Sequence, residues 1–250
     1  MFVPLHDENS LRSISFQYVT VGLIVLNVLV FLIEQAGMEE SAIAGFALVP
    51  FELLGPTPAA SGAEDVGAAS QLVPEPLTLL TYMFFHVSWL HLIGNMLFLW
   101  VFGDNVEDSM GHLRFLAFYL LCGIIAGLVH AMIVNGASSG LSVEAAAAST
   151  EADQYLASQS PLIGASGAVA GVIAAYLMLH PNVRVWVLAF RIFPLRIYAW
   201  VALGLWVLMQ VVMVFIPQAG PVAWWAHIGG LVAGGVLIVF FRRRDVPLFS

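Results

Sequence analysis

Four polar residues lie inside or at the edge of long apolar stretches, where a polar side chain is costly and is a candidate for function by default. They are Ser166, His227, His91 and Asn95. Serine alone is a weak nucleophile, but a histidine within hydrogen-bond reach can take its proton and later pass that proton to a leaving amine. His91 and Asn95, four residues apart, project from one helix face and can donate hydrogen bonds to a developing oxyanion. Together these residue types suffice for acyl transfer.

The spacing of Ser166 and His227 predicts that they lie at one depth. Ser166 comes 14 residues before His180 and His227 comes 14 residues before Phe241, so each lies about 21 Å from the end of its helix. Both helices carry small residues at four-residue spacing, which lets backbones approach closely. These are Gly167 and Gly171 in one helix and Ala226, Gly230 and Gly234 in the other. We therefore expect the hydroxyl and the imidazole to meet below the membrane surface.

The elements that must position these residues are membrane helices. Hydrophobic residues make up 60% of the 250 residues, charged residues only 10%, and the mean hydropathy is +0.92, whereas about a quarter of a soluble domain is charged. A helix needs about 20 apolar residues to cross the hydrocarbon core. We predict an all-α membrane protein with six transmembrane helices, near Phe16–Ile33, Leu90–Phe102, Leu113–Val134, Ser166–Leu179, Ile197–Ile216 and Val222–Phe241. The second is expected to extend a turn or more beyond these bounds at one or both ends.

The basic residues, all of them arginines, predict the orientation of this bundle. They all fall on one side if both termini are cytoplasmic, as the positive-inside rule requires. They are Arg12, Arg114, Arg184, Arg191, Arg196 and Arg242 to Arg244. The opposite loops, Glu34–Ser88 and Asn135–Ile163, carry acids and no arginine. This placement fits a multi-pass protein of a bacterial inner (plasma) membrane.

We predict one membrane domain over residues 1–250, with a short cytoplasmic N-terminus at 1–15, a core at 16–241 and a cytoplasmic tail at 242–250. The Ala/Ser/Gly-rich stretch before Ser166 is predicted to be mostly a solvated connector, with room for a short helix around Glu144–Leu156.

Composition also limits the ligands. A net charge of -8 without any lysine argues against a nucleic-acid partner. The single cysteine, Cys122, allows neither an intramolecular disulfide nor a thiolate metal site. A metal held by His86, His91 and His227 is an alternative, but no acid lies nearby to orient the imidazoles. We expect neither a metal nor a cofactor.

Other polar residues in the spans have a simpler interpretation. Asn27 and Gln210 are expected to form hydrogen bonds that hold helices together. No acid lies in the spans near His227, so its tautomer and orientation must be set by packing or by a neutral partner. A GxSG string alone is weak, because the strand that precedes a nucleophile elbow is missing here.

Three strings of residues, in this order, resemble the motifs of the rhomboid family of intramembrane serine proteases. They are HxxxxHxxxN at His86, His91 and Asn95, GxSG at Gly164 to Gly167, and AHxxGxxxG at Ala226, His227, Gly230 and Gly234. The resemblance implies that Ser166 is the nucleophile and His227 the general base. It also implies that His91 and Asn95 surround the oxyanion, with His86 supporting the outer loop and Gly164 helping to position the substrate.

A further string, ExxxGxxR at Glu107, Gly111 and Arg114, matches a structural motif of the family. Two features depart from the family pattern. The first outer loop has no Trp-Arg pair, so its bracing must be made differently. Position 170 is Ala170 where some members place an aromatic residue that stacks on the base, which leaves open how His227 is oriented.

The expected function is an intramembrane serine endopeptidase that cleaves single-span membrane proteins near the outer face of the bilayer. The alternative is a non-catalytic relative that binds membrane proteins; such relatives lose the serine or the histidine, and this chain has both. A transporter would show an internal repeat and broken mid-membrane helices, and neither is found. The segment Gly220 to Trp225 is either a mobile lid beside His227 or part of an interfacial aromatic belt.

Overall fold

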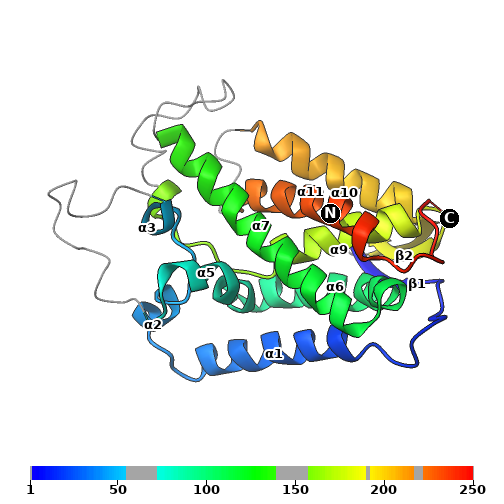
Figure 1. The fold of residues 1–250 in the computed structure, drawn as a ribbon, viewed down its shortest axis with the longest axis horizontal. Coiled ribbons are helices and arrows are strands. Elements are labelled where there is room, and N and C mark those ends of the chain that lie inside the picture. The colour runs from blue at the N-terminus through cyan, green and yellow to red at the C-terminus, as the bar shows by residue number, and fades with distance from the viewer. Residues whose placement is uncertain (1, 55–71, 139–156, 190–191, 217–221, 250) are drawn as a thin grey trace, which may run out of the picture.

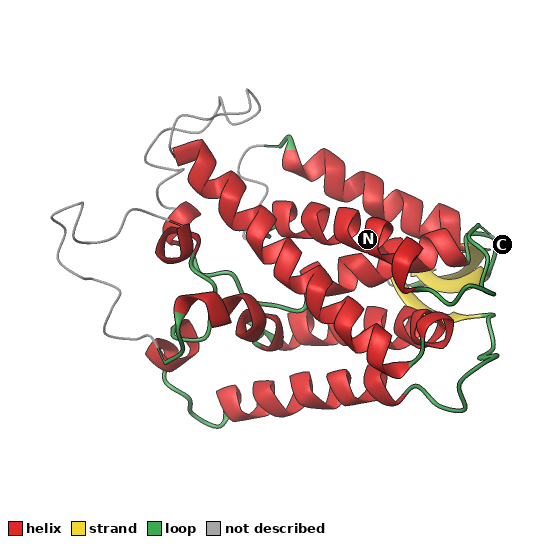
Figure 2. Cartoon of the chain, in the orientation of Figure 1, coloured by secondary structure: helices red, strands yellow, loops and turns green. Residues whose placement is uncertain are grey.

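The computed structural model describes residues 2–54, 72–138, 157–189, 192–216 and 222–249. Its main body is a bundle of helices, and a small sheet closes one end (Figures 1 and 2). Apolar helices occupy all six of the predicted places. They are α1 (Tyr18–Gln35), α6 (Trp89–Met110), α7 (His112–Ser138), α9 (Ser166–Leu179), α10 (Ala199–Val214) and α11 (Trp224–Phe241). Short helices α2 (Glu40–Ala44) and α3 (Pro50–Leu54) lie at the end opposite the sheet (Figure 1).

Not all six helices satisfy the criteria for a membrane span. Among the described residues, α1, α7 and α11 are individually long and apolar enough. Helix α6 qualifies only together with the preceding α5 (Glu75–Thr81) and the short η1 (Tyr82–Phe84), from which it bends by 84°. Helices α9 and α10 are apolar but shorter. The chain is thus a mostly helical membrane protein with three to four candidate spans, and the count of six remains a prediction.

The all-α prediction is wrong at one end of the molecule. Strands β1 (Phe2–Asp7), β2 (Arg184–Ala189) and β3 (Phe193–Tyr198) form an antiparallel sheet in the order β1-β2-β3. In β2, Val185 and Val187 are buried whereas Arg184 and Trp186 are exposed, which is the period-two alternation of a strand with one covered face. The predicted N-terminus at 1–15 therefore contains an ordered edge strand.

Helix α6 extends beyond Phe102, as the sequence predicts, and two buried carboxylates at its last turn bind the start of the chain. Glu107 accepts hydrogen bonds from the backbone N–H groups of Val19 (3.0 Å) and Thr20 (2.8 Å), which satisfies free donors at the start of α1. Asp108 accepts three more, from the N–H groups of residues 12 to 14. The acid of the ExxxGxxR string is therefore structural, and it holds α1 to α6.

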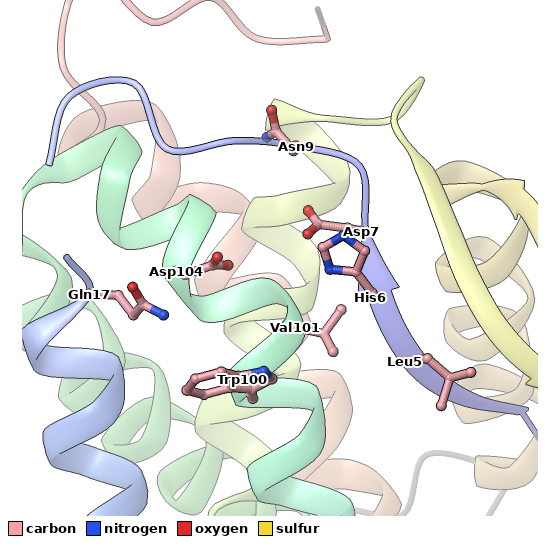
Figure 3. A pocket seen from close by; sticks show the side chains of 8 residues that line it. All are labelled: Leu5, His6, Asp7, Asn9, Gln17, Trp100, Val101 and Asp104. Carbon is pink, nitrogen blue, oxygen red and sulfur yellow. The ribbon is translucent and has the colours of Figure 1, made fainter. Parts of the chain in front are cut away.

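A cavity of about 200 Å³ lies between β1 and α6 at the sheet end. His6 and Asp7 from β1 reach it from one side and Asp104 from α6 from the other (Figure 3). Asp7 is buried and accepts hydrogen bonds from Tyr176 Oη (2.6 Å) and Asn105 Nδ2 (2.9 Å). Burial outweighs these bonds and raises the pKa of Asp7 from 3.8 to about 6.

This shift predicts a pH-dependent stability. The folded chain binds the Asp7 proton more tightly than the unfolded chain, so stability falls as the pH rises from about 4 to about 6, by at most about 3 kcal/mol. Asp7→Asn keeps an oxygen acceptor for Tyr176 and Asn105 and removes the titration. Thermal unfolding in detergent should show the variant gaining on the wild type as the pH is raised from 4 to 7. A difference in Tm that is constant with pH would contradict this explanation.

Candidate active site

Helices α9 and α11 lie side by side, and each begins toward the end of the bundle opposite the sheet (Figure 1). Ser166 and His227 meet where these two helices begin. The serine is the first residue of α9, and the histidine lies in the first turn of α11. Ser166 Oγ is 2.8 Å from His227 Nε2, which is hydrogen-bond distance. The imidazole is buried, with 8% of its residue surface exposed. The expected meeting of hydroxyl and imidazole is therefore present in the structure.

Glycine allows this approach. A Cβ atom on Gly230 would lie 2.0 Å from the carbonyl oxygen of Gly167, and one on Gly234 would lie 2.1 Å from that of Gly171. Helix backbones cannot move away from such contacts without separating the helices. The small residues predicted to line both helices thus bring the backbones of α9 and α11 into direct contact, and the hydroxyl and imidazole at their ends are brought together with them.

The second nitrogen of the imidazole has a partner that the sequence did not reveal. His227 Nδ1 is 2.7 Å from Oε1 of Gln210, which is 1% exposed and comes from α10. The prediction that Gln210 joins helices is confirmed, but its partner is the histidine itself. Its only sequence signal is that it is an amide in an otherwise apolar span.

Aromatic side chains surround the imidazole although position 170 is a buried alanine. The Trp206 ring, also from α10, lies 6.1 Å from the His227 ring between centroids with an interplanar angle of 32°. Trp224 meets the same ring edge-on at 5.9 Å and 89°. Packing against His227 is thus supplied by α10 and by the first turn of α11, since α9 carries only Ala170 there.

His91 and Gly164 are in close contact. Gly164 has a φ of +125°, which favours glycine, and a Cβ there would lie 2.6 Å from Cε1 of His91. The Gly164 N–H donates to the Tyr82 carbonyl at 2.9 Å, and Tyr82 Oη donates to the Gly123 carbonyl at 2.7 Å. This network fixes the chain just before Ser166 against the imidazole of His91.

Asn95 lies one turn beyond His91 on α6 and is 7% exposed. Within the described residues, neither its Nδ2 nor His91 Nδ1 has a hydrogen-bond partner. Buried donors without partners are costly, and here they occur on the helix that faces the start of α9.

His86 is 2% exposed and packs edge-on against His91, with ring centroids 5.0 Å apart. In the part of the chain that is described, no three His, Cys, Asp or Glu residues are placed to hold a metal ion, so the geometry gives no support to the metal alternative.

The loop that is predicted to be the first outer loop is braced by backbone pairing in place of a Trp-Arg pair. Leu48 and Leu162 exchange hydrogen bonds of 3.1 and 2.8 Å, and Phe46 stacks on Phe85 at 5.1 Å. The Leu48–Leu162 pairing holds the loop against the segment that leads into Ser166, and the Phe46–Phe85 stack joins the two ends of the loop itself. In the segment predicted as a mobile lid or an aromatic belt, Trp224 and Trp225 belong to α11. Gly220 and Pro221 lie outside the described residues. The short helix predicted at Glu144–Leu156 lies outside them as well.

The fold and site together define a helical, multi-pass membrane protein in which a buried histidine and a partly exposed serine form a pair between two glycine-lined helices. The family model described as Rhomboid domain matches residues 74–244, which include this pair. The chain belongs to the rhomboid family.

Sequence matches to individual proteins support this family assignment. The chain is 25% identical over 166 residues to "RHOMBOID-like protein 12, mitochondrial" of Arabidopsis thaliana, covering 66% of this chain and 46% of that protein. It is 30% identical over 116 residues to "Presenilin-associated rhomboid-like protein, mitochondrial" of Homo sapiens, covering 46% and 25%. It is 29% identical over 130 residues to "Rhomboid protein 1, mitochondrial" of Saccharomyces cerevisiae, covering 52% and 32%. The matches thus span less than half of each relative.

Proposed function

We propose that this protein is an intramembrane serine endopeptidase that cleaves single-span membrane proteins. The observation that carries the proposal is the 2.8 Å contact between Ser166 Oγ and His227 Nε2. Ser166 attacks the carbonyl carbon of the scissile bond while His227 takes the hydroxyl proton, and the protonated imidazole then delivers it to the leaving amine. A water molecule, activated by the same imidazole, hydrolyses the acyl-enzyme and frees Ser166.

The negative charge on the tetrahedral intermediate needs donors. Ser166 is the first residue of α9, and the first N–H groups of a helix have no intrahelical partner. With the unpartnered donors of His91 and Asn95, its N–H would form the oxyanion site. Gly164 contributes by admitting the ring of His91, and His86 by packing behind that ring.

The substrate is a transmembrane helix that must unwind before its backbone becomes accessible, since helical hydrogen bonding shields peptide bonds in lipid. Hydrolysis also needs water, so the site must open toward the outer solution. This proposal includes six spans and cytoplasmic termini. The assignment of this protein to a bacterial plasma membrane depends only on where its arginines lie. The three relatives named above carry mitochondrial names instead.

Covalent labelling distinguishes the endopeptidase from a non-catalytic binder of membrane proteins. A serine-directed, mechanism-based inhibitor should label Ser166 of the protein in membranes, and peptide mass analysis should locate the adduct. His227→Gln should prevent labelling, because the serine then lacks its base. Capture of single-span proteins without any labelling of Ser166 would favour the binder.

Asn95→Ala should slow cleavage without abolishing it. One oxyanion donor contributes about 3 kcal/mol to transition-state stabilisation, which is on the order of a hundredfold in kcat. Cleavage of a model single-span substrate in reconstituted vesicles measures this. Asn27→Ala is the matched control, because Asn27 is also a buried amide but donates within α1 to Leu23, at 2.8 Å. Equal rates for the two variants would reduce Asn95 to a packing role.

A further inference from the structure

We propose that α10, through Gln210 and Trp206, holds His227 in the tautomer in which it can act as a base. This inference rests on the proposed function and adds a positioning residue to it. The two side chains lie one helical turn apart, and both contact the imidazole of His227. Gln210 forms a hydrogen bond with Nδ1, and the Trp206 ring packs against the imidazole ring. Neither touches the reacting atoms.

The backbone carbonyl oxygen of Trp206 determines the direction of both hydrogen bonds that the Gln210 amide makes. Gln210 Nε2 is 3.3 Å from the backbone carbonyl oxygen of Trp206. A carbonyl oxygen only accepts, so the amide nitrogen must face it, and the amide oxygen must face His227. The amide oxygen also only accepts, so His227 Nδ1 must carry the proton.

This assignment determines the state of the other ring nitrogen. A neutral imidazole with a proton on Nδ1 has a lone pair on Nε2. Nε2 lies 2.8 Å from Ser166 Oγ, so its lone pair can accept the hydroxyl proton. The opposite tautomer would place a proton on Nε2 and leave the ring unable to act as a base toward the serine, which is the consequence expected when the partner of a catalytic histidine is lost.

Because both side chains are buried, the tautomer of His227 depends strongly on Gln210. Gln210 is 1% exposed and His227 8% exposed, so water is poorly placed to replace the amide. No carboxylate bonds the imidazole within the described residues. A neutral amide therefore takes the place of the acid that orients the histidine in a serine triad.

The test compares Gln210→Leu, which removes the acceptor at similar size, with Gln210→Glu, which keeps an oxygen in reach of Nδ1. We expect Gln210→Leu to lower kcat about ten- to hundredfold, the effect of one unsatisfied buried donor, with KM changed little. Gln210→Glu should recover most of that loss. Asn27→Leu is the matched control for replacing a buried amide in a span, and it should leave kcat unchanged.

A second readout does not depend on cleavage. In protein labelled with ¹⁵N in its histidine rings, the two nitrogens of His227, assigned by loss of their signals in His227→Gln, should show a protonated Nδ1 and an unprotonated Nε2 at neutral pH. Gln210→Leu should shift the ring toward the opposite tautomer. A protonated Nε2 in the wild type, or an unchanged spectrum and kcat in Gln210→Leu, would overturn the inference.

The two hypotheses fail in different ways. If no substrate is cleaved but the wild-type ring shows the Nδ1 proton and Gln210→Leu removes it, the positioning role stands and the endopeptidase proposal falls. If Ser166 is required for cleavage but neither the spectrum nor kcat responds to Gln210→Leu, the endopeptidase stands and the positioning role falls.

Discussion

Cleavage of a membrane-anchored substrate should fall by about four orders of magnitude or more when Ser166 is replaced by alanine, because a catalytic nucleophile has no substitute within the site. Ser166→Ala removes only Oγ and its 2.8 Å contact with His227 Nε2. Alanine suits the first turn of a helix, so the protein should still fold. Product formation in reconstituted vesicles, with the unfolding temperature measured in parallel, checks both expectations.

His227→Gln should cause a loss of similar size, and the double variant should lose little more, since residues that act as a unit are not additive. Persistent cleavage by Ser166→Ala at more than a few per cent of the wild-type rate would overturn the assignment of the nucleophile. Losses in the single variants that multiply in the double variant would indicate that the two side chains act independently.

Gly234→Ala should abolish most of the proposed cleavage although position 234 touches neither the serine nor the histidine. Its new Cβ would lie 2.1 Å from the carbonyl oxygen and 2.5 Å from Cα of Gly171. Backbone atoms cannot rotate aside, so α9 and α11 must separate. A displacement of about 1 Å in a catalytic pair costs on the order of a hundredfold in rate, and overpacking costs about 1–3 kcal/mol of stability.

The adjacent residue gives the control. A Cβ on Gly235 would meet only Met178 Sδ, at 3.7 Å, which is ordinary contact. Gly235→Ala makes the same chemical change in the same helix and should leave both rate and unfolding temperature close to wild type. Similar behaviour of the two variants would show that the glycine contact seen between α9 and α11 does not set the position of the active site.

The sequence alone predicted where the long helices lie and which faces of α9 and α11 touch. Both conclusions rest on patterns within one segment: apolar runs of spanning length, and small residues four apart. Ser166 and His227 could be paired from the sequence because both lie the same number of residues from the end of a helix, and helix rise is constant. A helix has the same rise and turn at every residue, so the positions and faces of its side chains follow from the sequence of that helix alone.

Other features were decided only by the tertiary structure. The sheet was missed because β1 and β2, 182 positions apart at their first residues, become strands only by pairing with each other. The pairing of Leu48 with Leu162 also joins residues that are far apart in the sequence. The partner of His227 could not be identified, because an amide within an apolar run looks the same whether it bonds a backbone carbonyl or an imidazole. Which of these occurs depends on how α10 is rotated against α11, and that rotation is set by packing across the whole bundle.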